Sequence, residues 1–297
     1  GTSWVALGSI SSSSAERIAT LDDGAGPTLL LQGILRDPLT LLGNSLARFF
    51  GPTWTSFPLA PGVVVRSMQV LDTPLGPRLF VGAQDLLDST GRVDRWDNGA
   101  WTTLGQLGDA YPTAQSFATA NLGAGRRLFV GGSFSLAGDA QAANVAEFDG
   151  TAWHPLGGGN GVDRPIECLR VYDDGSGPAL YAGGSFRAAG TSVAPRVARW
   201  NGTSWTPVGA WSGPAVHALA AFDDGTGTAL FAGHDEGVSK WDGTNWSPVA
   251  SAPSARVNAL AVFDSGQGTE LVAAGTFSQL GAVFLRNVAA WNGTSWR

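Results

Sequence analysis

Apolar and polar positions along the chain follow one pattern that occurs six times. An aromatic residue is followed five positions later by a tryptophan, then by a loop, an apolar strand, a turn rich in Asp and Gly, and a second apolar strand. The pairs are Phe49/Trp54, Trp96/Trp101, Phe148/Trp153, Trp200/Trp205, Trp241/Trp246 and Trp291/Trp296. Counted from Trp4, successive second tryptophans lie 50, 47, 52, 52, 41 and 50 residues apart, which is typical of a four-stranded propeller blade.

Each repeat predicts two β-hairpins. In the first, Asn201-Gly202 lies between alternating strands and favours a type I′ turn. That register places Trp200 opposite Thr203 and Ala198 opposite Trp205, with both tryptophans on one face of the sheet. The second hairpin contains an aligned Asp or Asn, a glycine four residues later and a leucine seven residues later in every copy. The aligned residues are Asp22, Asp72, Asn121, Asp173, Asp223 and Asp264; the glycines are Gly26, Gly76, Gly125, Gly177, Gly227 and Gly268; the leucines are Leu29, Leu79, Leu128, Leu180, Leu230 and Leu271.

The repeat predicts an all-β fold: one domain over residues 1–297 that forms a six-bladed β-propeller with four antiparallel strands per blade. In the copy that contains Asp223, strands are expected at about 216–222, 229–233, 238–241 and 245–249. Thr2 to Leu7 are expected to form the outer strand of the last blade and so close the ring, which leaves Thr294 to Arg297 redundant. Because the chain begins within a repeat, we expect it to be part of a larger protein.

Composition excludes several classes of partner. The formal net charge is −6, with one lysine among 18 basic residues, which argues against binding of nucleic acid or of an anionic membrane. No apolar run reaches the length of a membrane span, so direct membrane insertion is not expected. Cys168 is the single cysteine, so no intrachain disulfide can form.

The copies differ where a ligand site is expected. Six residues before each aligned Asp or Asn, at the start of the innermost strand, the side chain is polar in every repeat but is not the same in all of them. These residues are Glu16, Arg66, Gln115, Glu167, His217 and Asn258. In a closed ring they surround one mouth of the axial channel, where mixed charges and amides indicate a ligand-binding site. The alternative is a tunnel mouth that is polar only because water fills it.

Two loops on the same face are secondary candidates. The loop between the second and third strands shortens in the fifth repeat to His234, Asp235, Glu236 and Gly237, which predicts a notch in the wall of the face. These side chains suit a metal ion or proton transfer, but a short hydrophilic turn explains them better, and no metal or cofactor is predicted. The long loop from Gly157 to Pro165 contributes Asp163 and Arg164, because variable loops on a rigid scaffold are common binding sites.

The glycine pairs Gly131-Gly132 and Gly183-Gly184, each followed by an aromatic-turn-Trp hairpin, resemble kelch repeats. The phrases Trp-Asn-Gly-Thr-Ser-Trp and Asp-Asp-Gly-x-Gly are more similar to kelch-like propeller repeats of large secreted or surface proteins of bacteria. The resemblance covers the whole chain and implies an extracellular or cell-surface location and an adhesive or interaction role. It departs from the glycine pair in four repeats, which carry Gln32-Gly33, Gly82-Ala83, Gly233-His234 and Ala274-Gly275.

Three functions remain open at this point. The leading hypothesis is a non-catalytic binding or scaffold propeller that recognises a protein or a glycan through its variable-loop face. The second is a glycosidase or lyase in which Glu16 and Glu167, or Asp163, act as acid and base about 5–9.5 Å apart. The third is a purely structural component of a larger surface assembly.

Overall fold

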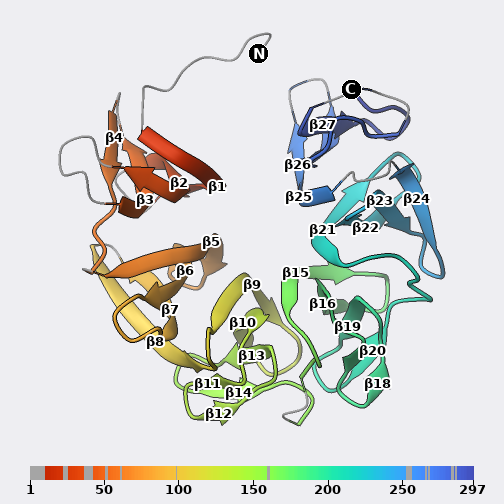
Figure 1. The fold of residues 1–297 in the computed structure, drawn as a ribbon. Coiled ribbons are helices and arrows are strands. Elements are labelled where there is room, and N and C mark those ends of the chain that lie inside the picture. Colours follow the sequence, from red (N-terminus) through yellow and green to blue (C-terminus); the bar gives the residue numbers. More distant parts are fainter. Residues whose placement is uncertain are drawn as a thin grey trace.

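The structure of the protein is a computed structural model. It describes residues 11–22, 26–36, 43–50, 53–60, 62–97, 99–158, 161–251, 256–264, 266, 268–281, 284 and 286–297. All regular secondary structure in these ranges is β-strand, and Figure 1 shows the sheets arranged as six blades around an axis. The predicted six-bladed β-propeller is therefore confirmed.

The six blades follow one another in sequence order, and the innermost strand comes first in each. Blade one is β1 (Ser11–Asp22), β2 (Pro27–Arg36), β3 (Gly43–Phe50) and β4 (Thr53–Ser56); blade two is β5 (Val63–Thr73), β6 (Gly76–Asp85), β7 (Gly91–Asp97) and β8 (Ala100–Gly108); blade three is β9 (Thr113–Asn121), β10 (Arg126–Ser133), β13 (Val145–Phe148) and β14 (Trp153–Pro155). Blade four is β15 (Ile166–Asp173), β16 (Pro178–Gly184), β19 (Val197–Trp200) and β20 (Trp205–Pro207); blade five is β21 (Val216–Asp223), β22 (Thr228–His234), β23 (Gly237–Trp241) and β24 (Trp246–Ser251); blade six contains β25 (Arg256–Asp264), β26 (Thr269–Thr276) and β27 (Val288–Trp291).

The Asp-Gly turns form as the repeat predicts. In blade five the Asp223 carboxylate accepts hydrogen bonds from the amides of Gly225 and Gly227, at 2.9 and 3.0 Å. The glycine four residues after the aligned Asp or Asn has a positive φ, between 85° and 113°, in all six blades. Only glycine adopts this conformation without strain, so the invariant glycines are explained by the turn.

The tryptophan hairpin has a different register from the one expected. Trp200 lies directly opposite Trp205, and their ring centroids are 5.4 Å apart. The turn spans four residues instead of two, because the Asn201 side chain accepts hydrogen bonds from the amides of Thr203 and Ser204 and so closes an Asx turn. Both rings still share one face, but as a direct cross-strand pair.

The ends of the chain correct a further expectation. Trp296 bridges back to Trp291, and the backbones of Ala290 and Arg297 exchange two hydrogen bonds. Thr294 to Arg297 therefore are not redundant: they supply the outer edge of blade six, because the Asn292-Gly293 turn closes this hairpin locally. The expected closing strand from Thr2 to Leu7 lies outside the described residues.

Two of the loops between second and third strands form short strands of their own. In blade three this loop forms β11 (Leu136–Ala137) and β12 (Ala140–Gln141), which extend the sheet of blade two through β8. In blade four it forms the hairpin β17 (Ala188–Ala189) and β18 (Ser192–Val193), and Ala189 bridges to Val162. Phe134 and Phe186 anchor these two loops and are fully buried. These loops therefore serve packing between blades.

Packing between neighbouring blades makes up most of the core. One apolar cluster joins Ala220, Phe222 and Phe231 of blade five to Val257 and Leu271 of blade six, and similar clusters join the other neighbours. The repeated leucine after the Asp-Gly turn is buried in five blades and half-buried in blade one. Each blade thus completes its core only against another blade, as in other repeat proteins.

Candidate functional site

The six polar residues predicted to surround the channel mouth occupy one structural position. In every blade the pairing between the first and second strands skips this residue, which leaves it in a β-bulge. A bulge leaves its extra residue out of the ladder and turns its side chain away from the regular alternation. The backbone therefore presents one side chain per blade, from a residue outside the strand pairing, at the same end of the innermost strand. These residues are Glu16, Arg66, Gln115, Glu167, His217 and Asn258.

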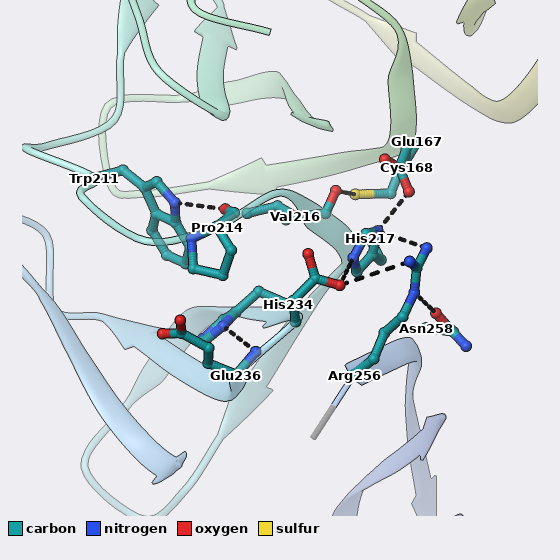
Figure 2. Close-up of polar contacts among 11 residues, drawn as sticks. Glu167, Cys168, Trp211, Pro214, Val216, His217, His234, Glu236, Arg256 and Asn258 are labelled. Atoms are coloured by element: carbon teal, nitrogen blue, oxygen red, sulfur yellow. Dashed lines mark hydrogen bonds and ion pairs between the residues drawn. The ribbon is translucent and has the colours of Figure 1, made fainter. Parts of the chain in front are cut away.

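His217 is the centre of a charged cluster that joins three blades (Figure 2). Its Nδ1 lies 2.5 Å from Oε2 of Glu167 in blade four, and its Nε2 lies 2.8 Å from Oδ1 of Asp235. Asp235 comes from the short loop between β22 and β23. On the other side, Arg256 of β25 lies 3.7 Å from the same Asp235 oxygen and donates to Asn258 at 2.7 Å. We call these five residues the His217 cluster.

The His217 cluster stabilises a charged imidazole. Burial of the ring favours its neutral form, but the hydrogen bonds to Glu167 and Asp235 outweigh burial and hold the pKa of His217 above its ordinary value, against a smaller opposing effect of Arg256. In its charged form, which the raised pKa favours, His217 donates from both ring nitrogens to carboxylates and is a doubly anchored cation. It therefore fixes the position of two carboxylates and does not offer a nitrogen to a substrate.

A cavity of about 430 Å³ opens beside this cluster. Four of the six predicted residues line it: Gln115, Glu167, His217 and Asn258. The rest of the lining includes Arg17, Ser133, Pro165 and Ser185, so residues from blades one, three, four, five and six contribute to one cavity.

The other two predicted residues contact groups of their own blades. The Glu16 carboxylate accepts a hydrogen bond from the side-chain amide of Gln32 at 3.1 Å, and the same amide also donates to the carbonyl of Val65 in blade two. Arg66 donates to the side chain of Gln84 at 3.1 Å. Arg17, next to Glu16, was not predicted but lines the cavity.

The expected notch in blade five is filled. Trp211, from the connection between blades four and five, is buried, packs edge-on against His234 at 5.3 Å between ring centroids, and donates to the carbonyl of Pro214. His234 itself is buried, with Nε2 3.0 Å from the Ser239 hydroxyl and Nδ1 accepting from the Glu236 amide. Burial lowers the pKa of His234 to about 4, so the ring is neutral. His234 and the Glu236 amide are therefore parts of a folded turn, while Asp235 belongs to the His217 cluster.

Asp163, one of the two secondary candidates in the long loop from Gly157 to Pro165, caps the backbone of a neighbouring loop. Its Oδ1 accepts hydrogen bonds from the amides of Arg187 and Ala188, at 2.7 and 2.9 Å. Partial burial raises the pKa of Asp163, but these two bonds outweigh it and keep the pKa below its usual value. Its neighbour Arg164 is exposed. Glu16, Glu167 and Asp163, the residues considered as acid and base, thus bind separate partners: Glu16 accepts from Gln32, Glu167 anchors His217, and Asp163 holds a loop.

Within the described ranges, no group of three or more His, Cys, Asp or Glu side chains is arranged to hold a metal ion. The same part of the chain contains no helix that is long and apolar enough to cross a membrane. Cys168, beside Glu167, is buried, and burial strongly raises the pKa of its thiol.

The His217 cluster predicts a particular dependence of stability on pH. Because folding raises the pKa of His217, its charged form contributes stability that is fully present below the unfolded pKa of about 6.5 and is lost as pH rises through the folded pKa. The difference in unfolding free energy between the wild type and His217→Gln is therefore expected to shrink as pH is raised from about 6 to about 9, measured by urea denaturation.

The same assignment is testable at the level of single histidines. In an NMR titration the ring protons of His217 are expected to titrate above about pH 6.5, whereas those of His234 should titrate near pH 4. A His217 ring that stays neutral at pH 6 would contradict the doubly anchored cation.

Comparison with known proteins identifies the fold. No protein-family model matches the chain, and no curated protein matches its sequence. Among solved structures, the chain is similar to BBS1N in complex with ARL6DN, soaked with mercury, with a TM-score of 0.52 and 16% identity over 86% of this chain and 73% of that one. The same complex soaked with lead gives a TM-score of 0.49 at 16% identity over 86% and 87% of the two chains, and the Dos1 propeller gives 0.40 at 11% identity over 86% and 61%. At this level of identity, the first comparison shows that the chain shares the β-propeller fold.

Proposed function

We propose that this protein is a non-catalytic interaction propeller that binds a protein partner at the mouth of its axial channel. The observation that carries the proposal is the cavity beside the His217 cluster, which is lined by polar side chains from five of the six blades. A site assembled from so many repeats exists only in the folded ring.

The chemistry of the cavity favours recognition over catalysis. Glu167 and Asp235, the two carboxylates of the cluster, are both bound to His217, and both ring nitrogens of His217 are occupied. Amides and hydroxyls make up much of the remaining polar lining, from Gln115, Asn258, Ser133 and Ser185. Such groups orient a ligand through hydrogen bonds without transferring protons.

The size of the cavity limits how a partner enters. At about 430 Å³ it lies within the range of about 300–1,000 Å³ that is usual for small binding sites. We therefore propose that a partner inserts the tip of a loop into the mouth and contacts the surrounding rim. BBS1N, a chain with the same fold, has been solved in complex with another protein, ARL6DN, which supports a protein as the class of partner.

Location is part of the same proposal. The resemblance to kelch-like repeats of secreted and surface proteins supports a secreted or cell-surface protein that is a component of a larger assembly. A glycan is the alternative ligand on this face, and the test below therefore includes glycans.

The test is selection of loop binders followed by substitution at the mouth. A library of disulfide-closed peptide loops is selected against the immobilised protein, and Kd is then measured for the variants Gln115→Ala, Asn258→Ala and Glu167→Gln. The two alanine variants remove an amide from the cavity and Glu167→Gln removes the negative charge beside His217, so each is expected to weaken binding about tenfold, which corresponds to about 1.4 kcal/mol.

Leu75→Ala serves as the matched control. Leu75 is exposed in the turn between β5 and β6, at the opposite end of the innermost strand from the mouth, so its loss should leave Kd unchanged. Selected loops whose affinity depends on Leu75 and not on the mouth residues would refute the proposed site. A parallel panel of glycans tests ligand class: mouth-dependent binding to glycans without any mouth-dependent loop binder would refute a protein partner.

A further inference from the structure

The innermost strand of each blade has two faces that contact different neighbours. Residues one, three and five positions before the aligned Asp or Asn face the following blade, as shown by Ala220 and Phe222 of blade five, which pack against Val257 and Leu271 of blade six. Polar members of this set follow the same rule: the Ser67 hydroxyl of blade two donates to a backbone carbonyl of blade three.

Residues on the other face contact the preceding blade. In blades two to five, the residue four positions before the aligned Asp or Asn is large, apolar and at most 7% exposed. These residues are Met68, Phe117, Leu169 and Leu219. Leu169, for example, packs in one cluster with Ala118 and Ala120 of blade three. Every interface between blades is therefore built from one forward face and one backward face.

The forward face of blade six keeps this pattern but is exposed. Ala259, Ala261 and Phe263 repeat the Ala-x-Ala-x-Phe sequence of Ala218, Ala220 and Phe222 in blade five. In blade five these three side chains are at most 7% exposed, whereas Phe263 is 58% exposed and both alanines of blade six are exposed.

The backward face of blade one is exposed as well. Ile18 occupies the position of Met68, Phe117, Leu169 and Leu219, and 65% of its surface is accessible. Blade one packs against β5 and β6, and blade six packs against β21, β22 and β23. Figure 1 shows the first and last blades on opposite sides of an opening in the ring. The molecule thus presents both halves of the interface that joins its own blades.

We propose that the backward face of blade one and the forward face of blade six together form an interaction surface that takes one further blade of this repeat type. The occupant is a four-stranded blade with large apolar residues on its backward face and a small-small-aromatic pattern on its forward face. Blade six itself has this chemistry, since its backward face covers Ala220 and Phe222 of blade five. The new interfaces would continue the five that already join the ring.

The experiment adds such a blade to the chain. Arg297 follows Trp296 as Ser247 follows Trp246, so a second copy of residues 248–297 appended after Arg297 continues the repeat in register. Parent and fusion both carry Ala274→Gly, because blades two to five have glycine at this position, where Val257 of the next blade approaches Gly233 closely. Both also carry Cys168→Ser, the residue found at this position in blades two and three, and Phe263→Cys as a reporter.

The thiol at position 263 is expected to react freely with a thiol reagent in the parent and at least tenfold more slowly in the fusion. The melting temperature of the fusion should exceed that of the parent by about 5–10 °C, because two interfaces between blades are added. A control fusion with Leu260→Asp and Val262→Asp in the appended copy only should lose both effects.

Three results would overturn the proposal. An appended blade that changes neither reactivity nor melting temperature would show that the faces do not take a blade. A parent thiol that is already protected in a monomer would show that blades one and six cover each other. Protection that appears only with a doubled mass in light scattering would assign the surface to a second copy of the chain.

Discussion

Phe222→Ala is expected to lower the free energy of unfolding by about 3–5 kcal/mol, whereas Phe263→Ala should lower it by less than about 1 kcal/mol. Both residues stand one position before the aligned Asp on the forward face of an innermost strand. Phe222 is 3% exposed, with its ring 5.7 Å from that of Phe231, whereas Phe263 is 58% exposed. The expected loss of unfolding free energy differs because the next blade buries Phe222 but not Phe263, although both residues are phenylalanines.

Equilibrium urea denaturation followed by tryptophan fluorescence measures both values. The two variants control for each other, because the substitution and the position in the repeat are the same. An equal, large loss for both would show that the forward face of blade six is covered in solution. An equal, small loss would contradict the packing of blade six on blade five.

Gly183→Ala is expected to destabilise the fold by about 1–3 kcal/mol. A Cβ at this position would lie 2.6 Å from Sγ of Cys168 and 2.7 Å from Cγ1 of Val216, the first residue of blade five. The added methyl group must push two neighbouring blades apart. The destabilisation is measured as a lower midpoint of urea denaturation. As a comparison, Ala274→Gly at the equivalent position of blade six should lower the free energy of unfolding by only about 0.5–1 kcal/mol.

A double-mutant cycle identifies the cause of the Gly183→Ala effect. Val216→Ala removes one of the two atoms that the new Cβ would meet, so the double variant should be more stable than the sum of the single losses predicts. Strict additivity of Gly183→Ala and Val216→Ala would place the strain elsewhere and contradict the close approach of the two blades.

The features that the sequence predicted correctly are local ones. The strands of the fifth repeat are found at 216–223, 228–234, 237–241 and 246–251, close to their expected limits, because alternating apolar residues and turn glycines act over a few positions. The aligned glycines have the expected positive φ, since a turn at each repeat imposes the same requirement on the backbone.

The register of the tryptophan hairpin was wrong for a reason that is also local. Asn-Gly favours a two-residue turn, but the Asn201 side chain caps the amides of Thr203 and Ser204 and extends the turn to four residues. Trp200 and Trp205 consequently become direct partners. The two-residue turn and the side-chain-capped turn differ little in free energy. The dipeptide Asn-Gly is compatible with both, so it does not show which one forms.

The candidate site was predictable in position but not in its contacts. Six polar residues at one repeat position indicated the mouth, and the structure places each of them in a β-bulge. That Asp235 meets His217, that Arg256 joins them and that Trp211 fills the expected notch depend on loops of neighbouring blades. Such contacts join residues that are distant in sequence, and no periodic pattern encodes them.

The central claim is that six blades curve around one axis, and distances between spin labels test it most directly. Thr55, Thr206 and Arg297 each follow the second tryptophan of their repeat and are exposed at the outer edges of blades one, four and six. Labels are attached through Thr55→Cys with Thr206→Cys, or Thr55→Cys with Arg297→Cys, in a Cys168→Ser background. In the ring, blades one and six lie on the two sides of the opening and blade four lies across the ring from blade one (Figure 1), so the 55–297 distance is expected to be shorter than the 55–206 distance. In an extended stack, where sheets lie about 10 Å apart, the 55–297 distance would be the longer of the two by about 20 Å, and that result would contradict the account.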